Sequence, residues 1–258
     1  MAEIYLHNKY AGGDADVVKH ACLASSLSAL LSALPEKTPY FETHAGAGCY
    51  SLQPNNPERQ NGIKAVAPLL AEHALFTDFS IALARSGYES TGTYPGSAYI
   101  AACSGAIGQL SLCENNPAIA DALQLNIPKA DVYKQDGFES FSLVKPGSLV
   151  FIDPPYKSSD DYISVISFAE QLKKAGIEHV VLWYPLISAE LTANMLDLLH
   201  NLFEESCSVT VHREPAQEGK MTGYGMFGSS HLLTQNWQQI IELLQPQLPI
   251  TQIEFRDQ

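Results

Sequence analysis

The sequence predicts an α/β fold in which a mostly parallel sheet carries helices on both faces. From residue 97 onward, strand-like and helix-like patterns alternate along the chain, which is typical of parallel sheets joined by helical crossovers. Residues 149–152 are apolar throughout and read as a buried strand. Polar residues stand at the carboxyl ends of four expected strands, where open α/β sheets bind ligands. These residues are His44, Glu114, Asp136 and Asp153.

The first third of the chain is expected to begin the sheet and then to leave it. Residues 14–34 carry an apolar stripe at helical spacing that stops before Pro35. Residues 39–43 read as a short strand, and Gly46 and Gly48 in the next turn permit close backbone approach to a ligand. A loop and two helical patterns, 61–73 and 75–86, then follow. We expect one main domain, residues 1–53 and 94–258, with residues 54–93 as a small helical insertion.

The remaining elements follow from the alternation of the patterns. Ser97 can cap a helix that begins after Pro95-Gly96. The expected helices are 97–106, 116–125, 160–175 and 189–199. The expected strands are 109–113, 130–134, 148–152, 179–184, 206–212 and 229–234.

Composition and charge limit the class of protein. The 258 residues, 46% hydrophobic and 17% charged, suit a soluble globular protein with a sizeable core. Five cysteines without a C-x-x-C pair favour reduced thiols over disulfides or a zinc site. No apolar run is long enough for a membrane span, and the start of the chain lacks a signal peptide's apolar region. We therefore expect a cytoplasmic protein that needs no metal.

The net charge of −13 is the main evidence against a nucleic-acid partner, because phosphate binding depends on clustered Lys and Arg. A local basic patch can nevertheless coexist with an acidic remainder. The lysines and arginines near the candidate site segments are Lys9, Lys19, Arg59, Lys64 and Lys157.

The most informative motif is Asp-Pro-Pro-Tyr at residues 153–156. Proline has no N–H and a fixed φ, so Pro154 and Pro155 end the strand and leave the Pro154 carbonyl free to accept a hydrogen bond. Asp153 adds a carboxylate, and Tyr156 adds a flat ring. Together these groups suit a planar amine such as the N6 amino group of adenine.

The ends of the other strands suit a nucleoside cofactor. Glu114 can accept hydrogen bonds from ribose hydroxyls, while Asp136 can accept one from an adenine amino group and Phe138 can stack on the base. No G-x-x-x-x-G-K-[ST] motif is present, and residues 44–48 lack the full G-x-G-x-x-G of dinucleotide-binding enzymes. A nucleoside without phosphates fits better, and S-adenosylmethionine is the obvious candidate.

Several motifs in a fixed order resemble one family. They are Tyr5-Leu6-His7, residues 15–20 (Ala-Asp-Val-Val-Lys-His), residues 43–48 (Thr-His-Ala-Gly-Ala-Gly), Tyr94-Pro95-Gly96-Ser97, Glu114, Asp136-Gly137-Phe138, residues 152–156, Leu182-Trp183-Tyr184-Pro185, Lys220-Met221-Thr222 and Gly225-Met226. The chain resembles the class I S-adenosylmethionine-dependent adenine-N6 methyltransferases, and most closely the 23S rRNA (adenine(2030)-N6)-methyltransferase family, J type. The resemblance covers nearly the whole chain.

The resemblance implies a Rossmann-like methyltransferase domain with a seven-stranded sheet and a role for each matching residue. The residues that contact S-adenosylmethionine would be His20, His44, Ser97, Glu114, Asp136, Gly137 and Asp153. Asp153, Pro154 and Tyr156 would be catalytic, and Tyr5 and Lys19 would meet the RNA. The partner would be 23S ribosomal RNA, in a protein-free or early assembly form, and the enzyme would be a monomer. The chain departs from the family pattern at Lys9, Tyr10, Gly13, Asp14 and Gly223-Tyr224, which bears on substrate contacts.

The expected reaction is direct methyl transfer to adenine N6, with Asp153 and the Pro154 carbonyl accepting the two N–H bonds and Tyr156 stacking on the extruded base. Three alternatives remain open. DNA adenine can be methylated by the same chemistry, and a protein glutamine presents a similar planar NH₂, although glutamine-modifying enzymes usually carry Asn where this chain has Asp153. The third is a non-catalytic nucleic-acid-binding protein linked to DNA uptake.

Overall fold

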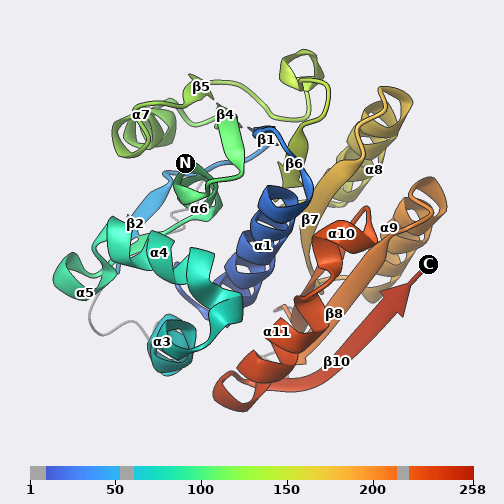
Figure 1. Ribbon diagram of the computed structural model, residues 1–258. Helices are drawn as coiled ribbons and strands as arrows, with labels where there is room; N and C mark the ends of the chain where they lie inside the picture. The colour runs from blue at the N-terminus through green and yellow to red at the C-terminus, as the bar shows by residue number, and fades with distance from the viewer. Residues whose placement is uncertain (1–9, 53–60, 214–220) are drawn as a thin grey trace.

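The computed structural model describes residues 10–52, 61–213 and 221–258. An eight-stranded sheet, with strands in the order β10-β8-β9-β7-β6-β1-β4-β5, forms its centre. These strands are β1 (Thr38–Glu42), β4 (Ile107–Cys113), β5 (Asp131–Tyr133), β6 (Leu149–Ile152), β7 (His179–Pro185), β8 (Cys207–Arg213), β9 (Gly223–Gly228) and β10 (Ile250–Asp257). All pairings among β1, β4, β5, β6 and β7 are parallel, whereas β9 and β10 run against their neighbours. The predicted mostly parallel α/β fold is thus confirmed (Figure 1).

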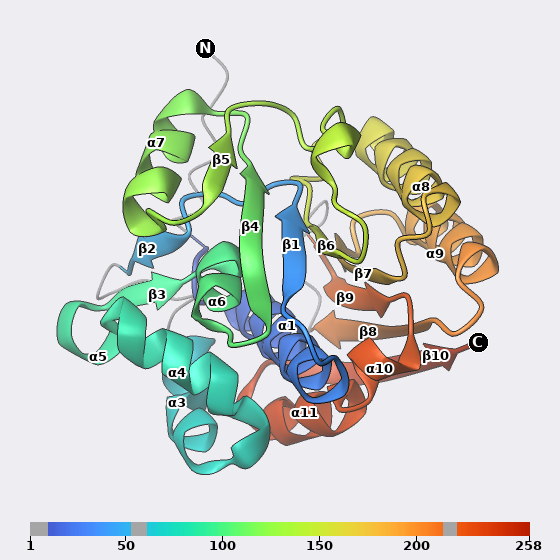
Figure 2. The ribbon, with the colours of Figure 1, turned by 45° about the horizontal axis from the view of Figure 1, so that its top comes forward.

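Helices cover both faces of this sheet. They are α1 (Asp14–Ala33), α3 (Ile63–Glu72), α4 (Thr77–Ser86), α5 (Tyr88–Thr91), α6 (Ser97–Cys103), α7 (Pro117–Asn126), α8 (Ser159–Lys174), α9 (Ala189–Leu202), α10 (His231–Thr234) and α11 (Trp237–Leu244). Short 3₁₀ turns are η2 (Ala74–Phe76), η3 (Phe141–Leu143) and η4 (Gln245–Gln247). Figures 1 and 2 show α1 and α11 on one side of the sheet, with α8 and α9 together on the other.

Strand β6 shows how the sequence builds two cores. Its four residues are fully buried, and successive side chains point to opposite faces. Leu149 and Phe151 join the cluster that contains α1, α4 and α11, while Val150 and Ile152 join the cluster that contains α8 and α9. An apolar run without polar alternation is therefore the pattern that a central parallel strand requires.

The expected seven-stranded sheet is wrong by one strand. Residues 250–257 add β10 as an antiparallel edge strand against β8, from Ile250–Arg213 to Asp257–Cys207. From Ile253 to Arg256 its side chains alternate between half-buried and exposed, and Ile253 and Phe255 pack against the core. The sequence analysis assigned no element to this segment.

The strand expected at 229–234 is also wrong, since residues 231–234 form α10 and the strand lies at Gly223–Gly228. Glycine is depleted in strands, so this segment did not read as one. Its glycines are required by crowding: a Cβ on Gly225 would lie 2.2 Å from the Tyr184 ring and 2.4 Å from the Val209 carbonyl oxygen.

Helices α3, α4 and α5 lie within residues 61–93, between strands β2 (Cys49–Ser51) and β3 (Thr93–Pro95), which pair with each other. Ile63, Val66, Phe79 and Leu83 share the cluster with α1 rather than forming a separate core. No single helix of the described segments has the length and apolarity to cross a membrane. Only the pair Ile63–Glu72 and Ala74–Ser86 reaches both criteria together, and it is bent by 114°.

Candidate active site

The carboxyl ends of the parallel strands bring the predicted residues to one edge of the sheet. Figure 2 shows the arrows of β1 and β4 pointing the same way. Glu114 directly follows β4 and Asp153 directly follows β6, while His44 comes two residues after β1 and Asp136 three residues after β5. Parallel pairing of these strands therefore gathers four side chains that are far apart in the sequence.

The Asp153 carboxylate is held by a buried lysine. Lys19 Nζ, from the second turn of α1, lies 2.8 Å from Asp153 Oδ2 and 3.0 Å from Asp16 Oδ1. Only 7% of the Lys19 side chain is exposed, compared with 16% for Asp153. Burial by itself would lower the pKa of Lys19, but the carboxylates of Asp153 and Asp16 outweigh it and raise that pKa above its ordinary value.

The Asp-Pro-Pro-Tyr segment makes a sharp turn at Tyr156, whose φ of 46° is the one positive value among the described non-glycine residues. Its hydroxyl donates a hydrogen bond to the Trp183 carbonyl at 3.0 Å. The Tyr156 ring is 6% exposed and lies edge-on to Tyr162 and to Trp183. Within the described chain, no donor reaches the Pro154 carbonyl, as the motif predicts.

A fully buried carboxylate, Glu42 at the end of β1, was missed by the sequence analysis. Tyr40 donates to Glu42 Oε2 at 2.8 Å, and the Ser97 hydroxyl donates to Oε1. Burial raises the pKa of Glu42 to about 8, and the two hydroxyl donors oppose this rise only in part. Ser97 therefore belongs to a buried hydrogen-bonded group. The one signal for it was an acid at the end of an otherwise apolar strand.

The two predicted histidines lie in different surroundings. His20 is fully buried, with Nδ1 2.8 Å from the Tyr94 hydroxyl and its ring beside Phe79. His44 Nδ1 lies 2.9 Å from Thr43 Oγ1, and its ring meets the Phe138 ring edge-on at 5.0 Å. Burial lowers the pKa of His44, although nearby acids oppose it, so this imidazole is neutral at pH 7.

The loops after β1, β4 and β5 fit closely around this edge. A Cβ on Gly137 would lie 2.1 Å from the Thr43 carbonyl oxygen, so only glycine allows the β5 loop to meet the end of β1. Asp136 Oδ1 accepts from Phe138 N at 2.9 Å, and Glu114 Oε1 accepts from Asn116 N at 2.8 Å. Burial raises the pKa of Glu114, with its backbone donors acting against the rise.

The departures from the family pattern gather at the start of α1. Asp14 is buried, and its Oδ2 lies 3.2 Å from Arg213 Nε at the end of β8. Burial raises the pKa of Asp14 despite this guanidinium, and the buried Tyr224 lies within electrostatic reach of the same carboxylate. Tyr5, the predicted RNA contact in the N-terminal segment, lies outside the described residues.

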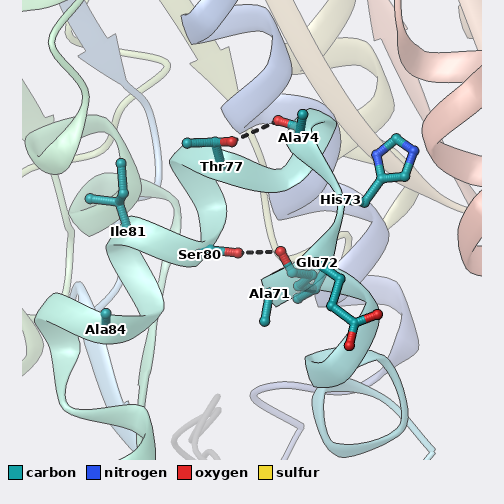
Figure 3. Close-up of a pocket in the computed structure, with 9 residues that line it drawn as sticks. Ala71, Glu72, His73, Ala74, Thr77, Ser80, Ile81 and Ala84 are labelled. Atoms are coloured by element: carbon teal, nitrogen blue, oxygen red, sulfur yellow. Dashed lines mark hydrogen bonds between the residues drawn. The ribbon is translucent and has the colours of Figure 1, made fainter.

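Two hollows mark the surface of the described residues. One of about 410 Å³ lies between α3 and α4 and is lined by residues such as Glu72, His73 and Ile81 (Figure 3). None of the predicted site residues lines it. A second of about 270 Å³ lies between Phe138 and α8, next to the β5 loop.

The parallel sheet, the glycine-containing turn after β1 and the acids at successive strand ends define a Rossmann-like class I methyltransferase. The chain belongs to the family described as "Ribosomal RNA large subunit methyltransferase D, RlmJ", whose model matches residues 36–252. The class and family predicted from the sequence are both confirmed.

Two curated relatives carry the name ribosomal RNA large subunit methyltransferase J. The protein from Escherichia coli (strain K12) is 33% identical over 211 residues, which cover 74% of this chain and 73% of the relative. The protein from Haemophilus influenzae is 30% identical over 204 residues, covering 73% and 72%. The crystal structure of protein LPL1258 from Legionella pneumophila superposes with a TM-score of 0.83 at 25% identity, covering 96% of this chain and 97% of that one.

Proposed function

We propose that this rRNA methyltransferase transfers a methyl group from S-adenosylmethionine to N6 of one adenine in 23S ribosomal RNA. The observation that carries the proposal is the set of hydrogen-bond partners of the Asp153 carboxylate. Lys19 occupies Oδ2, while no donor of the described chain contacts Oδ1 or the neighbouring Pro154 carbonyl. Two acceptors side by side at the end of β6 match the two N–H bonds of an aromatic amine. RNA is favoured over DNA and protein by the names that the family and the curated relatives carry.

S-adenosylmethionine fits the residues on this edge of the sheet. Its ribose hydroxyls and adenine amino group call for acceptors, and Glu114 and Asp136 each supply a carboxylate at this edge, held by a backbone N–H on Oε1 and on Oδ1 respectively. Gly46, with φ of 58°, keeps the β1 turn free of a side chain. We assign the remaining contacts to His20, His44, Ser97 and Gly137. When bound, the cofactor would supply a methyl group carried on a positively charged sulfur, and the neutral thioether would be the leaving group.

Asp153 and the Pro154 carbonyl activate the adenine amine as a nucleophile. The adenine N6 lone pair is delocalised into the ring, which makes the amine a poor nucleophile. Hydrogen bonds from N6 to Asp153 Oδ1 and to the Pro154 carbonyl draw the nitrogen toward tetrahedral geometry and localise that pair. The new carbon–nitrogen bond uses the lone pair, and N6 releases one proton toward Asp153 and water. Alignment of the two reactants contributes the rest of the acceleration.

Tyr156 is proposed to stack on the extruded base. Its positive φ is a conformation that costs on the order of 1–3 kcal/mol for a non-glycine residue, and such strain clusters at active sites. The bond from its hydroxyl to the Trp183 carbonyl fixes the ring in this conformation. Stacking contributes about 1–3 kcal/mol per base, comparable with the cost of unstacking the nucleotide.

The oligomeric state, the location, the form of the RNA and the domain boundaries belong to the same proposal. We propose a monomeric cytoplasmic enzyme that acts on protein-free or early-assembly 23S RNA, with Tyr5 meeting the RNA. Residues 1–53 and 94–258 form the methyltransferase domain, and residues 54–93 are a helical insertion in it.

The proposal is tested with radiolabelled S-adenosylmethionine. Protein-free 23S RNA from cells lacking the enzyme, duplex DNA and a glutamine peptide are offered separately. We expect label in the RNA alone, at a single N6-methyladenine found by nuclease digestion and mass spectrometry. Label in DNA or peptide, or in none of the three, contradicts the proposal.

A further inference from the structure

We infer that Lys19, held by Asp16, is a positioning residue for Asp153 and not a phosphate contact for RNA. The inference rests on the proposed methyl transfer, and it revises the role that the family resemblance implies for Lys19. It concerns three side chains that meet below the reacting edge of the sheet: Asp16, Lys19 and Asp153.

The position of Lys19 is unsuitable for a phosphate. Binding to RNA backbone requires an exposed cation that releases counterions, but 93% of this side chain is covered by protein. Its ammonium already contacts two carboxylates at 2.8 and 3.0 Å. An approaching phosphate would have to displace both of these pairs.

The surroundings of Lys19 hold the ammonium in one place. Asp16 lies one helical turn before it on α1, and Asp16 Oδ2 accepts a hydrogen bond from Gly12 N at 3.1 Å. The ammonium also lies 5.2 Å from the centre of the Trp183 ring, within cation–π range. Trp183 belongs to β7, the strand next to the one that ends in Asp153.

This arrangement does two things for Asp153. The hydrogen bond to Oδ2 orients the carboxylate, so that Oδ1 faces the amine together with the Pro154 carbonyl. The ammonium also balances the negative charge of this partly buried carboxylate. Lys19 acts through Asp153 and does not itself touch the base.

The experiment compares Lys19→Met with the double variant Lys19→Met/Asp16→Asn. The single change leaves two buried carboxylates without a cation. The double change restores the net charge that the three groups carry in the native protein. The double variant therefore tests the inference even if the single variant does not fold. Lys174→Met, an exposed lysine at the far end of α8, is the control.

We expect kcat to fall by about 100-fold or more in both Lys19 variants, with KM for RNA and the Kd of S-adenosylmethionine within about twofold of wild type. The inference is overturned if kcat is unchanged, KM for RNA is higher, and the slope of log affinity for RNA against log salt concentration falls by about 1.

A measurement on the unsubstituted enzyme does not depend on any variant folding. Reductive methylation followed by mass spectrometry should leave Lys19 unlabelled both with and without RNA. Labelling in the free enzyme that RNA suppresses identifies an RNA contact and rejects the inference. If wild-type enzyme transfers no methyl group to any RNA, the proposed function fails instead, and the two failures are thereby distinguished.

Discussion

The Ser97 hydroxyl donates its hydrogen bond to the buried carboxylate of Glu42, which joins the start of α6 to the end of β1. Tyr40 completes the pair of donors on that carboxylate. A residue that the family resemblance assigns to the cofactor is therefore also part of a buried hydrogen-bonded group at the end of β1. Changes at Ser97 should consequently affect both stability and binding.

The first prediction concerns this pair. Ser97→Ala leaves Glu42 Oε1 buried without its donor, which costs about 1–3 kcal/mol. Because the two residues are in contact, the effects of Ser97→Ala and Glu42→Gln should be non-additive by at least about 0.5 kcal/mol. Urea unfolding of the two single variants and the double variant measures this. Strict additivity would show that the hydrogen bond makes no contribution to stability.

The second prediction is a pH dependence of stability. Burial raises the pKa of Glu42 to about 8 in the folded protein, whereas the ordinary pKa of a glutamate, which the unfolded chain keeps, is 4.5. The folded state thus binds more protons between these values, and the contribution of Glu42 to stability falls as the pH rises from 4.5 to 8. Glu42→Gln removes this contribution.

The measurement is the free energy of unfolding at pH 6 and pH 9 for wild type and Glu42→Gln. The loss between the two pH values should be larger in wild type, since other titrating groups contribute equally to both proteins. An equal loss in the two proteins contradicts the assignment of a raised pKa to Glu42.

The third prediction concerns His200, buried between Ser206 and Ser208 at 2.9 Å from each. Burial, with the charge of Arg256 adding to it, lowers the pKa of His200 to about 4 from 6.5. The unfolded chain then binds more protons, so stability is lost as the pH falls from 6.5 to 4. His200→Gln, which cannot be protonated, should lose less stability than wild type over this range in urea titrations at pH 7 and pH 4.5. A steeper loss in the variant would refute the assignment.

The fourth prediction concerns Gly137. Gly137→Ala places a Cβ against the Thr43 backbone and must push the β5 loop away from the end of β1. The affinity for S-adenosylmethionine, measured by calorimetry, should fall by about tenfold or more, because a displacement of about 1 Å is costly at a pre-organised site. Gly105→Ala is the matched control, since its added Cβ meets only the Leu31 side chain at ordinary contact distance. Equal affinities in the two variants would separate Gly137 from the cofactor.

Much of the fold could be predicted from the sequence, because the local hydrophobic pattern of most segments agrees with the strand pairing that they adopt. Residues 149–152 are apolar without interruption, and they form the central strand that both faces bury. The same reading failed at 223–228, where the glycines look like a loop but are required by crowding, as Gly225 is by Tyr184 on β7 and Val209 on β8. Such crowding is a tertiary property and leaves no periodic signal in the sequence.

The candidate site shows the same division. Strand-end acids could be predicted, because parallel strands place their carboxyl ends at one edge. The pairing of Lys19 with Asp153 could not be, since it joins side chains 134 positions apart through the packing of α1 on the sheet. Glu42 was overlooked because an acid after a strand carries no information about which hydroxyls will enclose it.

The most direct test of the central claim is methyl transfer by Asp153→Ala, measured with tritiated S-adenosylmethionine and 23S RNA. Removal of the carboxylate should reduce incorporation to background while calorimetry still detects cofactor binding. Turnover close to that of wild type in this variant would show that Asp153 does not receive the amine, and it would contradict the mechanism at its central step.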